Sequence, residues 1–226
     1  MSKDDSQPIP LIIFSGLAAD AEIVRPQLEA FPQASCPEWL VPENDETLEA
    51  YCERFAQKID TGEPCLLAGI SFGGIVAQHC AKHLDARGVV LIATVRDPGE
   101  LPRRVRVFRP LVGSIRFVPL APFRLLSRGA AMLGSWAPLV SAIAKQFIKV
   151  DAQVVRWSLR KVLQWKNSLK VPCPVYQIHG KRDWVFPVGL TQPDEIIPSA
   201  RHVITLSHPE EVNDFLRAIV EKHSHN

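Results

Sequence analysis

Apolar residues along the chain alternate between short continuous runs and stretches in which they recur at helical spacing. Short apolar runs bounded by turn residues are typical of buried strands, and they occupy residues 10–16, 34–39, 65–70, 89–94, 173–180 and 194–198. Helical spacing is found between them, at residues 21–31, 46–59, 72–84 and 209–223. Regular alternation of strand and helix predicts a mainly parallel sheet with helices on both faces.

One serine stands where an apolar run meets the next helical stretch. In "GISFGG", Ser71 is flanked by Gly69 and Gly73. A turn from strand to helix with almost no loop strains its central residue and leaves no room for side chains two positions before and after it. The pattern G-x-S-x-G in this setting predicts a nucleophile elbow, which lifts the serine hydroxyl off the sheet at a helix N-terminus. The alternative is an ordinary tight turn whose serine caps the helix.

Several residues able to do chemistry follow the predicted strands directly. They are Ser15, Ser71, Asp97, Asp183 and His202. In open parallel sheets the active site lies at the carboxyl ends of the strands. We therefore expect a serine, an acid and a histidine to meet at one edge of the sheet.

Composition is that of an ordinary globular protein. A length of 226 residues suits one α/β domain, and 46% of the residues are hydrophobic. The net charge of +2 argues against nucleic-acid binding. Asp4 and Asp5 stand where a signal peptide is positively charged, so we expect none. The uncharged run at residues 129–144 is too short to cross a bilayer.

The metal-binding residue types do not form a known metal pattern. Five cysteines without metal spacing indicate a reducing compartment, so we expect a cytoplasmic protein. His79 and His83 lie four residues apart, a spacing that zinc sites use, but the glutamate of H-E-x-x-H is missing. We expect no metal, and we interpret both as solvated or partly buried helix histidines.

Charge divides the chain into three zones. Residues 1–100 carry 16 acidic and 7 basic side chains, residues 101–170 carry 1 and 14, and residues 171–226 carry 7 and 5. We interpret the middle zone as a helical basic insertion, a lid, in a core formed by the other two zones. Its apolar faces suit an acyl chain. Its positive charge could attract an anionic substrate, an acidic carrier protein or an anionic membrane surface, although a solvated helix face explains it as well.

The segments "GISFGG", "HGKRDWVFP" and "ARHVITLSHPEEVNDFL" resemble the α/β-hydrolase superfamily, and the likeness covers nearly the whole chain. The resemblance implies the α/β-hydrolase fold and a triad in the chain order serine, acid, histidine. Ser71 would be the nucleophile, Asp183 the orienting acid and His202 the general base. Backbone N–H groups of Leu17 and Phe72 would form the oxyanion hole, and no cofactor is implied.

The chain also departs from the family pattern. It has Ser15-Gly16 where many relatives have His-Gly, and it lacks the strands that usually precede the first one here. Only 19 residues separate Asp183 from His202. This short gap indicates a reduced helix between the last two strands, and it leaves Asp97 as an alternative acid.

His208 is the alternative histidine. In "SHPE", Ser207 can cap a helix and Glu210 can return the bond, so His208 has a structural explanation. A helix N-terminus also disfavours the imidazolium that a general base becomes. His202, which follows a strand, is therefore the expected base.

Together these features predict a serine hydrolase that cleaves a carboxylic ester or a thioester with an apolar acyl part, through an acyl-enzyme. A binding protein on the same scaffold is one alternative, because a fold does not fix a function. Acyl transfer and carbon–carbon bond hydrolysis by the same triad are the others.

Overall fold

The computed structural model describes residues 8–17, 19–60, 62–107, 109–110, 112–113, 121–132 and 138–224. Within these ranges one sheet of six strands has the order β2-β1-β3-β4-β5-β6, and all neighbouring strands are parallel. The strands are β1 (Leu11–Phe14), β2 (Ala34–Ser35), β3 (Cys65–Ile70), β4 (Ala86–Ile92), β5 (Val175–Gly180) and β6 (Glu195–Ile197). The predicted parallel sheet is confirmed.

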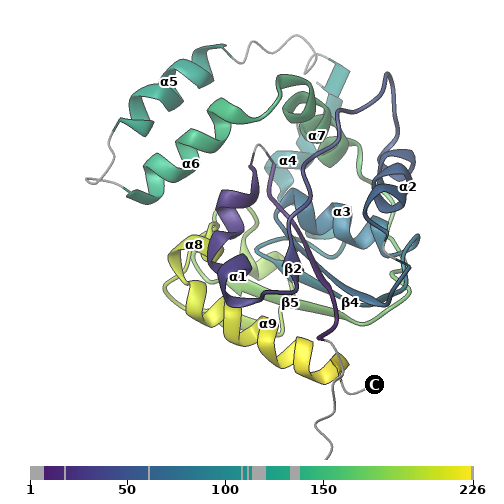
Figure 1. Cartoon of the computed structure of the whole chain (residues 1–226). Helices are drawn as coiled ribbons and strands as arrows, with labels where there is room; N and C mark the ends of the chain where they lie inside the picture. Colours follow the sequence, from purple (N-terminus) through teal and green to yellow (C-terminus); the bar gives the residue numbers. More distant parts are fainter. Residues whose placement is uncertain are drawn as a thin grey trace, which may run out of the picture.

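Helices cover both faces of this sheet (Figure 1). One face carries η1 (Ala21–Val24), α1 (Arg25–Ala30), α8 (Ile204–Ser207) and α9 (Pro209–Ser224), and the other carries α2 (Leu48–Ile59) and α3 (Phe72–Cys80). Successive side chains of a strand point to opposite faces. Leu11 and Ile13 of β1 accordingly pack into the first layer, and Ile12 and Phe14 into the second. Burial on both faces explains why the strands read as continuous apolar runs.

Helix α3 is shorter than its sequence pattern predicts. We expected a helix over residues 72–84, but α3 ends at Cys80. The N–H groups of Lys82 and His83 bond to carbonyls three residues back, and this tighter bonding is common at helix ends. The chain must turn here because β4 begins at Ala86.

The start of α9 also differs from expectation. Ser207 does not cap it, because Ser207 is the last residue of α8 and its hydroxyl donates to the carbonyl of Val203. His208 stands at the junction between α8 and α9. The sequence pattern had indicated only the second of these two helices.

The segment between β4 and β5 is a helical insertion. After the 3₁₀ turn η2 (Pro98–Glu100) it contains α4 (Arg103–Val107), α5 (Ala121–Ala131), α6 (Pro138–Lys149) and α7 (Ala152–Gln164). Residues 133–137, part of the uncharged run, lie outside the described residues, as do residues 1–7. In Figure 1, α5 and α6 lie beyond the sheet and its covering helices.

Helix α7 anchors this insertion in the core. Trp157 is buried against Tyr51 of α2, with ring centroids 4.2 Å apart, and its indole N–H donates to the carbonyl of Glu46. Helix α6 contacts the turn after β1, because Gln146 accepts the N–H of Asp20 at 2.7 Å. The insertion therefore meets the carboxyl end of the sheet. None of the helices within the described ranges combines the length and the apolar character needed to cross a membrane.

Candidate active site

Ser71 lies in a strained turn between β3 and α3. Its backbone φ is 53° and its ψ is −120°, a region that residues with a side chain rarely adopt. A Cβ atom on Gly69 would collide with the backbone of Gly73, and one on Gly73 would collide with the carbonyl oxygens of Phe14 and Ser15. Both glycines are therefore required by close packing, as a nucleophile elbow demands.

Neighbouring strand β4 and the residues after it hold this turn in place. The N–H of Ser71 donates to the carbonyl of Ile92 at 3.1 Å, and the carbonyl of Ser71 accepts the hydroxyl of Thr94 at 2.6 Å. Thr94 also packs against Gly74, where a Cβ would strike its methyl group. Sequence reasoning did not single out Thr94. Its one signal is a polar residue at the end of the apolar run 89–94.

His202 connects Ser71 to Asp183. Its Nε2 atom lies 3.1 Å from Ser71 Oγ, and its Nδ1 atom lies 2.8 Å from Asp183 Oδ2. Because a carboxylate only accepts hydrogen bonds, Nδ1 carries the proton and Nε2 is free to accept the serine hydroxyl. The three side chains come from the turns that follow β3, β5 and β6, so the structure brings them together at the carboxyl edge of the sheet.

The carboxylate of Asp183 is buried and fully engaged. Its Oδ1 atom accepts the N–H groups of Val185 at 2.7 Å and of Phe186 at 3.1 Å, while Oδ2 faces His202 and His179. Burial on its own would raise the pKa of Asp183, but the hydrogen bonds from the two histidines and from Phe186 hold that pKa well below its usual range. Asp183 is therefore ionised at neutral pH.

His179 is a second histidine at this acid, and sequence reasoning missed it. It is fully buried near the end of β5, with Nε2 at 2.8 Å from the carbonyl oxygen of Phe186 and 3.2 Å from Asp183 Oδ2. Both neighbours are acceptors, so Nε2 carries the proton and is shared between them. The available signal was a histidine inside an apolar strand, four residues before the acid.

The two alternative residues lie elsewhere. Asp97 caps η2, where its carboxylate accepts the N–H of Gly99 at 2.7 Å. His208 bonds through Nε2 to the hydroxyl of Ser199 at 2.8 Å and through Nδ1 to that of Ser207 at 2.9 Å. Neither residue joins the run of hydrogen bonds that ends at Ser71.

The turn after β1 packs against the elbow. A Cβ on Gly16 would lie 3.8 Å from the Cβ of Ser71, and Leu17 is the next residue. The Ser15 hydroxyl, donating to the carbonyl of Ala19 at 2.9 Å, braces this turn. Gly16 and Ser71 thus lie close together. Each is followed directly by one of the residues expected to supply the oxyanion donors, Leu17 and Phe72.

The histidines of α3 and the turn after it face a carboxylate. His79 Nδ1 lies 2.9 Å and His83 Nε2 3.7 Å from the carboxylate of Glu49. Burial lowers the pKa of His79 more than this carboxylate raises it. Among the described residues, no group of three or more histidine, cysteine, aspartate or glutamate side chains could hold a metal ion.

Comparison with known proteins gives the family. A family model described as "Alpha/beta hydrolase family" matches residues 8–215. The chain belongs to the alpha/beta hydrolase family. The resemblance predicted from the sequence is thereby confirmed, and so is the alpha/beta hydrolase fold with its helical insertion. The comparison with curated proteins found no match.

Solved structures of other hydrolases share the fold of this alpha/beta hydrolase. A thermophilic esterase from Thermogutta terrifontis is 17% identical, with a TM-score of 0.72 over 96% of this chain and 91% of that chain. An enol-lactonase from Burkholderia xenovorans LB400 is 15% identical, with a TM-score of 0.72 over 97% and 94%. A thioesterase from the prodiginine pathway of Streptomyces coelicolor is 15% identical, with a TM-score of 0.57 over 95% and 85%. At these identities the likeness concerns the fold.

Proposed function

We propose that this alpha/beta hydrolase cleaves a carboxylic ester, or a thioester, through an acyl-enzyme at Ser71. The observation that carries the proposal is the run of hydrogen bonds from Ser71 through His202 to Asp183, at 3.1 and 2.8 Å. Esterase, lactonase and thioesterase chemistry among the structural neighbours is consistent with it. All of these reactions begin with attack on an acyl carbon.

The proposed reaction gives each side chain one role. A serine hydroxyl is a weak nucleophile until a base takes its proton. As Ser71 Oγ attacks the carbonyl carbon, His202 Nε2 takes the hydroxyl proton, and the ionised Asp183 stabilises the resulting imidazolium. His202 then protonates the leaving alcohol or thiol. In the second half, the same Nε2 activates a water molecule that hydrolyses the acyl-enzyme.

Backbone N–H groups would stabilise the tetrahedral intermediate. We assign this role to Phe72, the first residue of α3, and to Leu17. The first N–H groups of a helix have no partner within the helix, and the helix dipole is positive at this end. Loss of one oxyanion donor typically lowers kcat by about 100- to 1,000-fold.

A binding protein without catalysis is the rival function. A backbone conformation such as that of Ser71 costs of the order of 1–3 kcal/mol and persists where function or packing requires it. A protein that only binds has no need of a strained serine hydrogen-bonded to a histidine. The geometry therefore favours catalysis.

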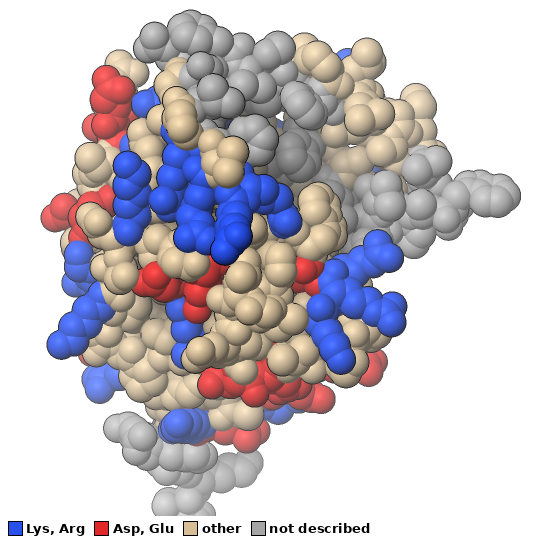
Figure 2. Space-filling view, turned by 180° about the vertical axis from the view of Figure 1, so that it is seen from behind, with Lys and Arg blue, Asp and Glu red and all other residues tan. Residues whose placement is uncertain are grey.

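The insertion contributes to the expected substrate class. We propose that it acts as a lid whose apolar faces contact the acyl part of the substrate. Figure 2 shows lysine and arginine side chains gathered on the face opposite to that of Figure 1, and α4 carries the exposed Arg103, Arg104 and Arg106. This charge would attract an anionic substrate, an acidic carrier protein or an anionic membrane surface. The five free thiols suit the cytoplasm.

A panel of p-nitrophenyl esters of increasing acyl length, with matched thioesters, tests the proposed function. We expect turnover with an optimum chain length, and Ser71→Ala should lower kcat/KM by about 10,000-fold or more. Thermal unfolding of the variant would show that its fold is intact. Equal turnover by wild type and Ser71→Ala would refute the proposal.

A further inference from the structure

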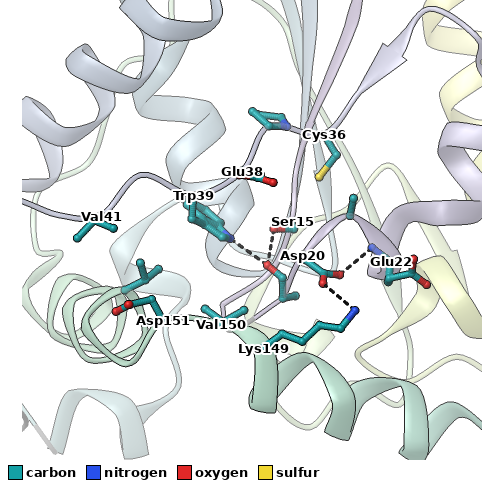
Figure 3. A pocket seen from close by; sticks show the side chains of 14 residues that line it. Ser15, Asp20, Glu22, Cys36, Glu38, Trp39, Val41, Lys149, Val150 and Asp151 are labelled. Atoms are coloured by element: carbon teal, nitrogen blue, oxygen red, sulfur yellow. Dashed lines mark hydrogen bonds and ion pairs between the residues drawn. The ribbon is translucent and has the colours of Figure 1, made fainter.

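A cavity of about 420 Å³ lies where the insertion meets the turn after β1 (Figure 3). Its walls come from three segments that are far apart in the sequence, residues 15–22, 36–41 and 149–154. The volume falls within the range of about 300–1,000 Å³ that is typical of small-molecule pockets. Ser71, Asp183 and His202 do not line it, so the cavity is a separate feature beside them.

Carboxylates outnumber cations in the cavity wall. The charged lining residues are Asp20, Glu22, Glu38, Asp151 and Lys149. Lys149 is already paired with Asp20, at 3.5 Å, as Figure 3 shows. Glu22 faces the guanidinium of Arg25 at 3.6 Å. The other two carboxylates of the wall belong to Glu38 and Asp151.

Glu38 and Asp151 have no cationic partner within the described part of the chain. Asp151 caps α7, where one carboxylate oxygen accepts the N–H of Gln153 at 2.6 Å. Glu38 is exposed at the rim. Two carboxylates at the cavity therefore have no cationic side-chain partner among the described residues, and they attract a cation and repel an anion.

An indole ring forms part of the same wall. Trp39 is held in place because its N–H donates to the carbonyl of Ala19 at 3.2 Å and its ring packs on Phe72 at 5.6 Å. The face of an indole is the aromatic surface that attracts cations most strongly. Burial raises the pKa of Cys36, another lining residue, to about 12. Its thiol therefore stays neutral and adds no further charge.

Apolar side chains complete the wall. They are Ala19, Val41, Val150 and Val154. A small, strongly hydrated cation would gain little from them, whereas an alkylated ammonium group presents methyl groups that they can contact. The mixture of carboxylates, indole and aliphatic side chains therefore matches the chemistry of an organic ammonium better than that of a small inorganic cation.

The cavity also adjoins the residues of the proposed reaction. Trp39 packs against Phe72, which directly follows Ser71. The turn that contributes Ser15 and Ala19 to the cavity reaches Ser71 through Gly16. Trp39 of the cavity wall therefore contacts Phe72, one of the two residues expected to supply the oxyanion donors.

We propose that the cavity binds an organic ammonium group and that, given the hydrolase function proposed above, this group is part of the ester substrate. Glu38 and Asp151 supply the charge, Trp39 the aromatic face and the valines the contacts to the alkyl groups. This local charge is opposite to that of the insertion as a whole. The two features consequently predict different substrates.

A pair of isosteric esters tests the proposal. A choline ester and the 3,3-dimethylbutyl ester of the same acid have the same shape but differ in replacing the quaternary nitrogen by carbon. We expect kcat/KM to be at least about tenfold higher for the choline ester, since cation–π and charge attraction are both lost in the isostere. A monosuccinate ester provides the anionic comparison.

Two variants connect this preference to the cavity. In the double variant Glu38→Gln with Asp151→Asn, the ratio of the two kcat/KM values should fall toward one. Asparagine at 151 keeps the helix cap, so that α7 is preserved. Glu221→Gln removes an exposed carboxylate on α9 that does not line the cavity. The ratio should be unchanged in this control.

Binding can be measured without turnover. In Ser71→Ala, choline and 3,3-dimethylbutanol are titrated while chemical shifts of the indole N–H groups are followed by NMR. We expect choline to shift one indole signal and the neutral alcohol to bind at least about tenfold more weakly. Adding Glu38→Gln and Asp151→Asn should weaken choline binding by a similar factor, and Trp39→Phe should remove the shifted signal.

The outcomes separate the cavity from the reaction. Carboxylate-dependent choline binding together with the ester preference supports the proposal. The same binding without an ester preference supports the ammonium site but assigns it to a free ligand. Equal kcat/KM for the two esters without choline binding would overturn the proposal, as would a preference for the monosuccinate ester. Neutral-ester turnover that depends on Ser71 would still leave the hydrolase function standing.

Discussion

The Nε2 atom of His202 lies 3.1 Å from the hydroxyl oxygen of Ser71, although 131 residues separate them in the chain. Ser71 follows β3, whereas His202 follows β6, three strands away in the sheet. Neighbouring strands lie about 4.8 Å apart, so about 14 Å separate β3 from β6. The two side chains and the hydrogen bond between them cover part of this distance. The segment after β6 covers the rest by folding back over the end of β5, where the N–H of Arg182 bonds to the carbonyl of Ala200.

His202 and His208 should behave differently when each is replaced. His202→Ala removes the proposed base, so kcat/KM for a p-nitrophenyl ester should fall by about 10,000-fold or more. His208→Ala removes two hydrogen bonds to serine hydroxyls in an exposed setting, and kcat/KM should stay within about threefold. Steady-state kinetics of both variants decide the matter. The reverse pattern would move the base to His208.

Gly73 should tolerate no side chain. Gly73→Ala drives a Cβ into the carbonyl oxygens at the end of β1, so it should lower the free energy of unfolding by about 1–3 kcal/mol or more. Gly189→Ala is the matched control, because no heavy atom lies within 4 Å of the added Cβ. Its effect should stay within about 0.5 kcal/mol. Urea unfolding of both variants measures the difference, and similar values for the two would contradict the elbow packing.

Asp183 should contribute a pH-dependent part of stability. Its pKa is lower in the folded protein than in the unfolded chain, so its stabilisation is fully present above the ordinary carboxyl pKa of about 3.9 and is lost as pH falls below it. Asp183→Asn lacks this dependence. The difference in free energy of unfolding between wild type and variant should therefore shrink as pH falls from about 4.5 to 2.5. Histidines with the ordinary pKa of about 6.5 do not titrate in this range. Urea unfolding at several pH values measures it, and a constant difference would contradict the assignment.

Arg104 should position the loop that carries Asp183. Its guanidinium donates to the carbonyls of Trp184 and Val185, and the N–H of Val185 in turn bonds to Asp183. Arg104→Ala should lower kcat for a neutral ester by about three- to thirtyfold, because small misplacements reduce catalysis. Arg103→Ala is the control from the same helix. Equal kcat values for the two variants would show that Arg104 does not position this loop.

The dependence of turnover on salt concentration tests the role of the basic insertion. If the insertion attracts an anionic substrate, kcat/KM for an anionic ester should fall as ionic strength rises from about 0.01 to 0.15 M, because the screening length shrinks from about 30 to 8 Å. Charge reversal at Arg103 and Arg106 should then reduce kcat/KM for that ester selectively. A neutral ester of equal chain length is the control. The same salt dependence for both esters would leave the insertion with only a role in solubility.

The parallel sheet could be predicted from the sequence, because buried parallel strands are apolar on both faces and read as continuous apolar runs. The end of α3 was not, because Leu84 keeps the helical spacing beyond Cys80. The helix ends there for a long-range reason, since Ala86 must pair beside Cys65 in the sheet. The spacing of apolar residues along a helix does not reflect pairing between distant strands.

The meeting of Ser71, Asp183 and His202 was predictable from their positions after strands and from the family motifs. The surroundings of Asp183 were not, because the contact with His179 depends on how the intervening turn folds back. The cavity was harder still to predict from the sequence, since Trp39 and Asp151 reach it from separate segments of the chain. Its charge is also opposite to that of the basic zone that contains Asp151.

Covalent labelling of the intact protein by a fluorophosphonate tests directly whether Ser71 is the nucleophile. We expect one adduct per chain, on the peptide that contains Ser71, when the product is analysed by mass spectrometry. Ser71→Ala should give no adduct, and His202→Ala should label at least about 1,000-fold more slowly. Labelling that persists in folded Ser71→Ala, or an adduct on another residue of the wild-type protein, would contradict the assignment of Ser71 as the nucleophile.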